Sequence, residues 1–397
     1  MSLRLSARAR SIKPSPTLGM AAEAGALKAA GKDVVDLSAG EPDFDTPEHV
    51  CAAARRAMDR GQTKYTPVGG TPELKDAIRE KLRRDDALVY ERNEIVASCG
   101  GKHALYNAFQ VLLEEGDEVV VPAPYWVSYY DMLVLAGATP KVVETTPASG
   151  FRMRPEQLEA ACGPKTVGVI LNSPSNPTGA VYDAGTLRAL GQVALRRTLL
   201  VFSDDIYEHI AETRVPNIGA LVPELRPRLL LFNAVSKTYA MTGWRIGWAA
   251  GPAEAVTAMT SLQSQSTSNP TSIAQAAAAA ALTGPQECVA AMAREFLERR
   301  DLVLDRLATI PGVETVKPGG AFYVFPDIGA YLGRTGPDGP IASAQDLGTY
   351  LLRHVGVATV PGEGFGAPRH IRLSYATTRA LLEDGIRRIA SGLARLR

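Results

Sequence analysis

Apolar runs alternate with amphipathic stretches between about residues 93 and 250. The runs contain few polar positions, which is typical of strands buried on both faces of a sheet. The stretches between them, such as 101–115 and 184–197, have the three- to four-residue apolar spacing of helices. This alternation predicts an α/β fold with a largely parallel sheet. The expected strands lie in EIVASCGG, EVVVPAP, TVGVILNSP, LLVFSDD, RLLLFNAVSK and RIGWAAG.

The pattern changes after about residue 285, where a long charged helix leads to short strands and a last helix closes the chain. The expected strands are GVETV, AFYVFPDI, VATVPG and HIRLSYA, and GRTGPDGP is expected to be a surface loop. This order predicts a smaller α+β domain, which the first 40 or so residues are expected to join, since they have little core of their own. The predicted division is an N-terminal arm at 1–40, a large domain at 41–284 and a small domain at 285–397.

Composition excludes several classes of protein. The chain has 46% hydrophobic and 21% charged residues, with 43 basic against 42 acidic side chains. This balance argues against nucleic-acid binding or membrane-surface binding driven by charge. The basic N-terminus has no apolar core, and the apolar stretch at 273–282 is too short to span a bilayer, so a cytoplasmic protein is predicted.

Cysteine and histidine spacing gives no sign of a metal site. The four cysteines form no CxxC pair and the five histidines show no HxxxH spacing. We therefore expect neither bound metal nor a disulfide framework, which fits a reducing compartment.

Polar residues gather where the predicted strands end, which is where ligands bind in open α/β sheets. Each feature alone has an ordinary structural explanation, such as a turn or a solvated lysine. Together they place an anion cradle, an aromatic face, an amide, a carboxylate, a phenol and a lysine along one sheet edge. The segments are Gly100–Lys102, Pro124–Trp126, Asn172–Gly179, Ser203–Tyr207 and Ser236–Lys237.

Some of these residues suit a phosphate and the flat face of a ring. Glycines at a helix start offer free N–H groups and the positive end of the helix dipole to a phosphate. Ser236 and Arg245 could complete that cradle, because arginine binds phosphate through two parallel hydrogen bonds. Trp126 offers a flat face on which a ring could stack.

Others of these residues suit a pyridine ring that carries an aldehyde. Asp204 could pair with a protonated ring nitrogen, while Tyr207 and Asn176 could hydrogen-bond a ring oxygen. Lys237 could form a Schiff base with an aldehyde. The ligand that combines these groups is pyridoxal 5′-phosphate, whose usual partners are a lysine and an acidic residue.

The chain resembles the fold-type I, pyridoxal-phosphate-dependent aminotransferases of class I, most closely the bacterial aspartate and aspartate/prephenate group. The resemblance implies a mostly parallel seven-stranded sheet in the large domain and a smaller α+β domain. One departure is Asp205, where the family more often has glutamate. The matching stretches cover nearly the whole chain in the family's order: LSAGEPDFDTPEHV, KYTPVGGTPELKDAI, PYWVSYYDM, NSPSNPTGAVY, SDDIYEHI, SKTYAMTGWRIGW, GGAFYVF and HIRLSYA.

The resemblance also implies roles for individual residues. Lys237 would be the Schiff-base lysine and proton shuttle, and Asp204 would pair with the ring nitrogen. Asn176 and Tyr207 would bind the ring oxygen, and Trp126 would stack on the ring. The residues expected around the phosphate are Gly101, Lys102, Ser236 and Arg245, with Tyr65 from the neighbouring subunit of a homodimer.

Substrate binding is implied in the same way. Lys102 would bind either the phosphate or the distal carboxylate of a dicarboxylic substrate, and the sequence leaves both readings open. Lys13, in the N-terminal arm, is associated in the family with activity on prephenate. The α-carboxylate would be bound by Arg372, helped by Asn176, Trp126 and the backbone around Gly40.

The expected activity is transfer of an amino group between L-aspartate, glutamate or prephenate and a 2-oxo acid such as 2-oxoglutarate, in ping-pong fashion through pyridoxamine phosphate. Two alternatives on the same fold stay open: an aminotransferase for aromatic or kynurenine-type substrates, and a C–S β-lyase. A cofactor-binding regulator is disfavoured, since only a short arm precedes residue 33 and no basic recognition helix is found. A dinucleotide oxidoreductase is disfavoured because no GxGxxG motif opens an early βαβ unit.

Overall fold

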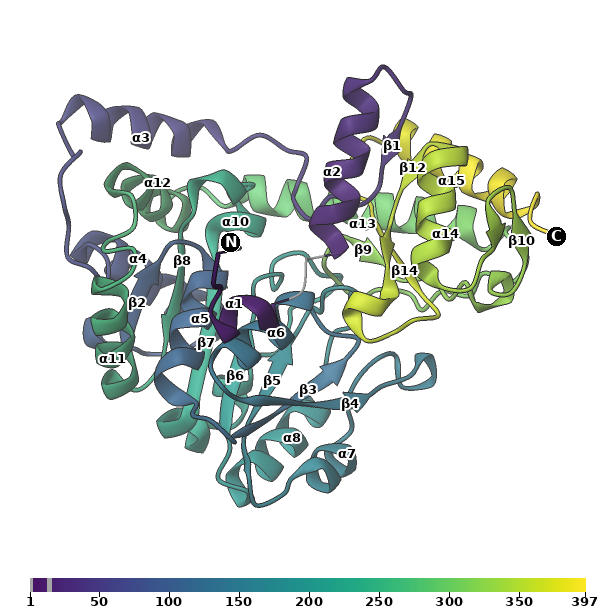
Figure 1. Ribbon diagram of the computed structural model, residues 1–397. Coiled ribbons are helices and arrows are strands. Elements are labelled where there is room, and N and C mark those ends of the chain that lie inside the picture. The colour runs from purple at the N-terminus through teal and green to yellow at the C-terminus, as the bar shows by residue number, and fades with distance from the viewer. Residues whose placement is uncertain (1–2, 13–15) are drawn as a thin grey trace.

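The computed structural model describes residues 3–12 and 16–397. A seven-stranded sheet with helices on both faces forms the larger body, and a smaller body lies beside it, at the right of Figure 1. The strand order is β2-β8-β7-β6-β5-β3-β4, and β8 runs antiparallel to both of its neighbours while the other pairs are parallel. The predicted mostly parallel, seven-stranded sheet is therefore confirmed. Its strands are β2 (Ile95–Ser98), β3 (Glu118–Ala123), β4 (Thr139–Glu144), β5 (Thr166–Asn172), β6 (Leu200–Asp204), β7 (Leu229–Ala234) and β8 (Gly247–Ala250).

Both faces of the sheet are buried, which explains why its strands are almost continuous in apolar residues. Successive residues of a strand point to opposite faces, so Val119 and Val121 pack in one core and Val120 in the other. The first core is shared with α5 (Gly101–Leu112), α6 (Val127–Leu135) and α11 (Ala253–Ser264). The second core is shared with α3 (Glu48–Asp59), α4 (Pro72–Asp86), α7 (Pro155–Ala161), α8 (Ala184–Arg196), α9 (Ile218–Leu221) and α12 (Ser272–Thr283).

The edge strand β4 was not among the six strands expected from apolar runs. It pairs with β3 along one side, and its residues are exposed or half-buried. Its sequence TPKVVE therefore carries polar residues between its valines, and Val142 is 41% exposed. An edge strand of this kind lacks the continuous apolar signal of a strand buried on both faces.

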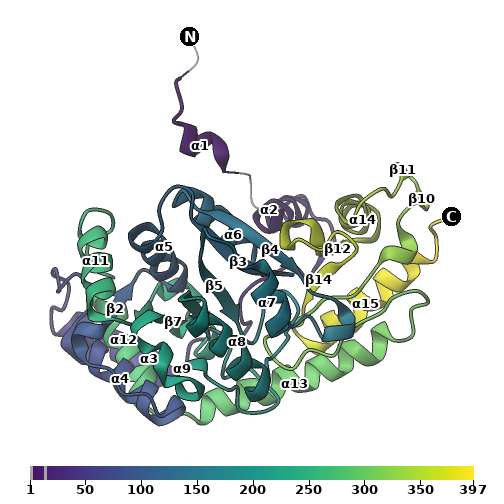
Figure 2. The same cartoon turned by 90° about the horizontal axis from the view of Figure 1, so that it is seen from below.

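The smaller body has a core of its own, built from both ends of the chain. Val35 and Leu37 pack with residues of the C-terminal helices, and β1 (Val35–Asp36) pairs in parallel with β12 (Val357–Ala358). The helix α13 (Glu287–Leu307) runs from the larger body to the smaller one (Figures 1 and 2). The boundaries predicted at residues 40 and 284 stay a prediction. The other elements of this body are α2 (Pro16–Ala29), α14 (Ala344–Tyr350), α15 (Arg379–Leu393), β9 (Tyr323–Val324), β13 (Val360–Pro361) and β14 (Ile371–Ser374).

One local expectation for the C-terminal part is wrong, and a second is incomplete. GVETV forms no strand, and only Glu314 makes a bridge, to Asp327. A Pro-Gly pair stands on each side of this segment, at 311–312 and 318–319, which leaves too few residues for a ladder. The expected surface loop at 333–340 instead contains a small hairpin, β10 (Thr335–Gly336) with β11 (Gly339–Pro340).

The N-terminal helix α1 (Ala7–Ser11) has no buried residue and lies at the outside of the molecule in Figure 2, close to α6. Lys13, which the sequence associates with prephenate, lies outside the described residues. Within residues 3–12 and 16–397, no helix combines the length and apolar composition needed to cross a membrane.

The aromatic packing within the sheet gives a stability prediction. Phe202 on β6 is fully buried, with its ring centroid 5.0 Å from that of Phe109 in an edge-to-face contact. Phe202→Ala is expected to lower the free energy of unfolding by about 3–5 kcal/mol, because it removes apolar contacts and leaves a cavity. Urea denaturation would measure the change. The control is Val89→Ala, at a position 63% exposed, where a change within about 0.5 kcal/mol is expected; equal losses in both variants would contradict this account.

Candidate active site

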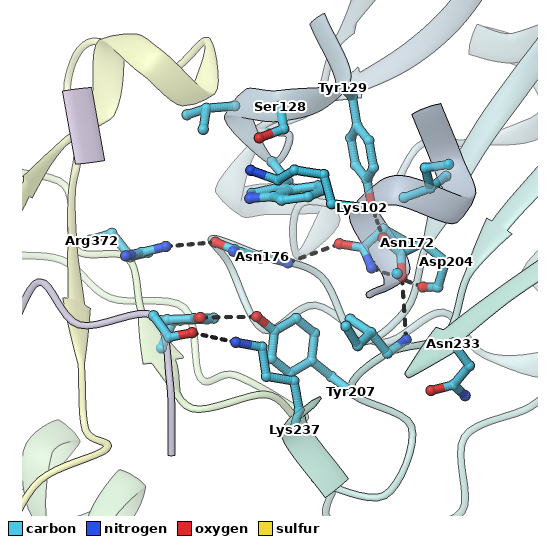
Figure 3. Close-up of a pocket in the computed structure, with 17 residues that line it drawn as sticks. Lys102, Ser128, Tyr129, Asn172, Asn176, Asp204, Tyr207, Asn233, Lys237 and Arg372 are labelled. Atoms are coloured by element: carbon cyan, nitrogen blue, oxygen red, sulfur yellow. Dashed lines mark hydrogen bonds between the residues drawn. The ribbon is translucent and has the colours of Figure 1, made fainter. Parts of the chain in front are cut away.

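A cavity of about 250 Å³ lies beyond the carboxyl ends of the sheet strands, with walls from both bodies (Figure 3). Of the residues singled out from the sequence, Ser236, Arg245 and Tyr65 do not line it. Ser236 is buried one residue before Lys237, and Tyr65 is 92% exposed. The nine that do line it are Gly40, Gly101, Lys102, Trp126, Asn176, Asp204, Tyr207, Lys237 and Arg372.

The parallel pairing of three neighbouring strands brings the polar residues together. Asn172 at the end of β5 pairs in register with Asp204 at the end of β6, and β7 runs parallel to β6. Lys237 follows β7 in the short helix α10 (Val235–Thr238). The Asn172 side chain links two segments at this edge. Its Nδ2 donates to the backbone oxygen of Asp204 at 2.9 Å, and its Oδ1 accepts from the backbone N–H of Asn176 at 3.0 Å.

Lys237 is a partly buried amine with an altered basicity. Its Nζ donates a hydrogen bond to the backbone oxygen of Gly40. Burial lowers the pKa of the Lys237 ammonium to about 8. The nearby positive charges of Arg372 and Arg245 lower this pKa as well, whereas the carboxylate of Glu41 acts in the opposite direction. A neutral amine, which is the form that can attack an aldehyde or accept a proton, is therefore accessible near neutral pH.

Asp204 is a buried carboxylate held by two donors. The Tyr129 hydroxyl donates to its Oδ2 at 2.5 Å, and the backbone N–H of Ile206 donates to its Oδ1 at 3.3 Å. Burial raises the pKa of Asp204 to about 6, although these hydrogen bonds and the charge of Lys237 lower it. At neutral pH the group is mostly ionised, so it can pair with a cationic nitrogen.

Arg372, on β14, is a buried guanidinium with open donors. It is 2% exposed; its Nη1 donates to Asn176 Oδ1 at 3.0 Å and its Nη2 to the backbone oxygen of Ser38 at 2.8 Å. Within the described residues its Nε has no hydrogen-bond partner, and no carboxylate lies within ion-pairing distance of the guanidinium. A buried cation that lacks an internal counter-ion is costly, so this side chain favours binding of an external anion.

A second anion position lies at the start of α5. Gly100 caps this helix with φ +92°, and an added Cβ would lie 2.3 Å from Nη2 of Arg245, so the arginine packs directly over the glycine. In the part of the chain that the structure describes, the backbone N–H groups of Gly101 and Lys102 have no acceptor. Free N–H groups, a helix N-terminus and an arginine together make a phosphate cradle.

Lys102 lies between the phosphate cradle at the start of α5 and the cavity. Its Nζ lies 4.9 Å from the centroid of the Trp126 ring, and both residues line the cavity. Partial desolvation lowers the pKa of Lys102, and the charge of Arg245 lowers it further. The geometry leaves both readings of this lysine open, because it adjoins the α5 cradle and also faces the cavity.

Sequence reasoning gave no role to three further residues of the site. Tyr129 and Asn172 hold Asp204, and Tyr323 shares a hydrogen bond of 2.9 Å with the hydroxyl of Tyr207. Burial raises the pKa of Tyr207 well above its usual value, so its hydroxyl keeps its proton. Tyr129 lies three residues after Trp126, a spacing that places two side chains on the same face of a helix. The sequence did not indicate which atom the Tyr129 hydroxyl would contact.

A metal-like cluster lies outside this cavity. Ligand atoms of Asp85, Glu208 and His209 lie within 4.8 Å of one another. The ammonium of Lys81 already forms ion pairs with Asp85, Asp86 and Glu208. The cluster is therefore a charge-paired network and gives no argument for a bound cation.

The comparisons with known proteins agree with this geometry. Residues 32–389 match the family described as aminotransferase class I and II, and the chain belongs to that family. An aspartate aminotransferase of Geobacillus stearothermophilus is 50% identical over 98% of both chains, and an aspartate/prephenate aminotransferase of Cereibacter sphaeroides is 49% identical over 97% of both. The crystal structure of the aspartate aminotransferase from Rhizobium meliloti superposes with a TM-score of 0.96 at 47% identity and covers all of both chains. That of Thermus thermophilus aspartate aminotransferase with maleate gives 0.92 at 44% identity, over 98% of this chain and all of the other.

Membership of this family implies pyridoxal 5′-phosphate as cofactor. The residues present fit that molecule. The α5 cradle suits its phosphate, the Trp126 face its ring, Asp204 its ring nitrogen and Lys237 its aldehyde.

The lowered pKa of Lys237 gives a prediction for the cofactor-free protein. Labelling of Lys237 by an amine-reactive reagent should rise with pH with a midpoint near 8, since only the neutral amine reacts. Glu41→Gln should move the midpoint to lower pH, because it removes the charge that favours the ammonium form. Mass spectrometry of the labelled peptide would follow the reaction. A midpoint unchanged or raised in Glu41→Gln would contradict this electrostatic account.

Proposed function

We propose that this chain is an aspartate aminotransferase that transfers the amino group of L-aspartate to a 2-oxo acid such as 2-oxoglutarate, and that also accepts glutamate or prephenate. One observation carries the proposal. The cavity that holds the reactive amine of Lys237 also holds the buried guanidinium of Arg372, whose Nε donor is open. The names of the relatives, aspartate and aspartate/prephenate aminotransferases, support the choice of substrate.

The roles of the residues around the cofactor follow from their chemistry. When bound, pyridoxal phosphate supplies an aldehyde that captures the substrate amine and a protonated pyridine ring that withdraws electrons from the substrate Cα. Trp126 would cover one face of the ring, and Asp204 would hold the proton at the ring nitrogen. Tyr207 and Asn176 would bind the ring oxygen, as donors that keep their protons at neutral pH.

Lys237 would hold the aldehyde between turnovers and act as base during them. With the aldehyde occupied by the substrate amine, the Nζ of Lys237 would be free to accept the proton from the substrate Cα. The lowered pKa makes the neutral amine available for this transfer.

Arg372 would bind the substrate α-carboxylate and so fix the position of Cα. Its planar guanidinium can form two parallel hydrogen bonds to a carboxylate, which a lysine cannot do. Asn176 and the carbonyl of Ser38 hold the group in place through its Nη1 and Nη2 atoms. Burial strengthens the interaction, because water does not compete for the charge.

The active unit would be a homodimer in which Tyr65 reaches the phosphate of the neighbouring subunit's cofactor. Tyr65 is 92% exposed and lies away from the cavity of its own chain, so a role in cofactor binding requires a second copy. Leu3 and Met58, at 86% and 50% exposed, are apolar side chains that such an interface could cover.

The cytoplasmic location expected from the sequence stays a prediction.

A spectrum of the purified protein tests the proposed activity. With pyridoxal phosphate bound, a visible absorption band should collapse on addition of L-aspartate and return on addition of 2-oxoglutarate. In Lys237→Ala, aspartate should not cause this collapse, because the proton acceptor at Cα is missing. A band that ignores aspartate and responds to aromatic amino acids would move the substrate to that class. Pyruvate release from cystathionine would instead indicate a C–S lyase.

The distal carboxylate gives a separate prediction for Lys102. The relative from Thermus thermophilus was solved with maleate, a dicarboxylate, which supports a cation for the second carboxylate in this group. Lys102→Ala is expected to lower kcat/KM for aspartate by about tenfold to a hundredfold, the loss of one charge-assisted contact. The kcat/KM for alanine, which has no distal carboxylate, should stay nearly constant. If cofactor affinity falls and both substrates suffer equally, Lys102 serves the phosphate.

A further inference from the structure

We propose that Tyr129 is a positioning residue for the amino-transfer reaction: its hydroxyl holds Oδ2 of Asp204 and keeps this side chain ionised, which leaves Oδ1 for the cofactor's ring nitrogen. The inference rests on the proposed function. It adds a residue whose hydroxyl donates its hydrogen bond to another side chain of the site.

The contact is short, buried and fixed by packing. Tyr129 lies in the first turn of α6 and is 2% exposed, and its hydroxyl oxygen is 2.5 Å from Oδ2 of Asp204 (Figure 3). Trp126, three residues earlier, packs edge-to-face on the Tyr129 ring with centroids 5.2 Å apart. The side chain that would stack on the cofactor therefore also holds the tyrosine in place.

Asp204 needs such a donor because its surroundings oppose its charge. Burial raises the pKa of Asp204 to about 6. Three groups oppose this effect: the Tyr129 hydroxyl, the backbone N–H of Ile206 and the positive charge of Lys237. The neighbouring phenol of Tyr207 keeps its proton, since burial raises its pKa well above the usual value, and so it brings no charge.

The three stabilising groups differ in whether they last through the reaction. The charge of Lys237 disappears whenever its amine is neutral, which the reaction requires of a proton acceptor. The Tyr129 hydroxyl persists, because burial and the adjacent carboxylate raise the pKa of Tyr129 well above the usual value. The backbone N–H of Ile206 also persists, at a longer distance of 3.3 Å. Tyr129 therefore supplies the closest donor that remains when Lys237 is neutral.

The hydroxyl can be removed without removing the ring. The ring of Tyr129 packs in the core that α5 and α6 share with the sheet, and a phenylalanine ring would keep this packing. Tyr129→Phe is therefore expected to fold and to bind pyridoxal phosphate. Without the hydroxyl, the pKa of Asp204 rises further, because one of the groups that lower it is gone. Asp204 is then partly protonated at working pH, and the ring nitrogen loses its counter-ion.

The experiment compares wild-type and Tyr129→Phe holoenzymes, each loaded with pyridoxal phosphate labelled with ¹⁵N in the ring. In the wild type, the ring nitrogen resonance should have the protonated position at pH 7.5. In Tyr129→Phe it should move toward the unprotonated position. The kcat for aspartate should fall by about tenfold or more, with a smaller change in KM, and the acidic limb of its pH profile should move to higher pH.

Tyr182→Phe is the matched control. Tyr182 is 3% exposed, and its hydroxyl accepts a hydrogen bond from the backbone N–H of Met153 at 3.0 Å, so the variant also loses one buried hydrogen bond. It does not contact Asp204 and does not line the 250 Å³ cavity. Its resonance and pH profile should match the wild type even if its thermal stability falls.

Two outcomes would overturn the inference. In the first, the wild type is active, and the ¹⁵N resonance and the pH profile of Tyr129→Phe are the same as those of the wild type. In the second, the ¹⁵N resonance and the pH profile shift equally in Tyr129→Phe and Tyr182→Phe, which would show a general loss of packing. A wild type that binds the cofactor but does not respond to aspartate would instead overturn the proposed substrate and leave the Tyr129 contact to be judged by the resonance.

Discussion

The site depends on the parallel pairing of β5, β6 and β7. Because the three strands run in the same direction, their carboxyl ends meet at one edge, and the residues that follow them become neighbours although they lie tens of positions apart in the sequence. In-register pairing of Asn172 with Asp204 fixes the floor of the cavity, and β7 delivers Lys237 beside it. An antiparallel order would have sent one of these ends to the opposite edge.

Much of this arrangement could be predicted from the sequence, since strands buried on both faces leave a continuous apolar signal and ligand chemistry gathers at their ends. The edge strand β4 lacks that signal, because its residues are exposed or half-buried. The role of Tyr129 could not be predicted either, since it depends on an interatomic distance between two helix- and strand-borne side chains 75 positions apart. Ser236 and Arg245, expected at the phosphate, lie beside the cavity rather than in its wall, and Arg245 reaches the cradle by packing over Gly100.

The charges of the site explain which ligands it favours. Positive side chains exceed the carboxylates around the cavity, and their mutual repulsion is part of the reason for the low pKa of Lys237. An anionic ligand would relieve this repulsion, so a phosphate at one end and a carboxylate at the other would stabilise the folded protein on binding. The groups involved are Lys102, Lys237, Arg245 and Arg372 against Asp204 and Glu41.

The hydrogen bonds of Arg372 join three distant parts of the chain. Its partners, Asn176 and Ser38, are 196 and 334 positions away in the sequence. Contacts of such long range cost loop-closure entropy, which the packing of both bodies must offset. During synthesis, the segments with Ser38 and Asn176 leave the ribosome before β14 does, so the hydrogen bonds of Arg372 can form only after both of its partners have been made.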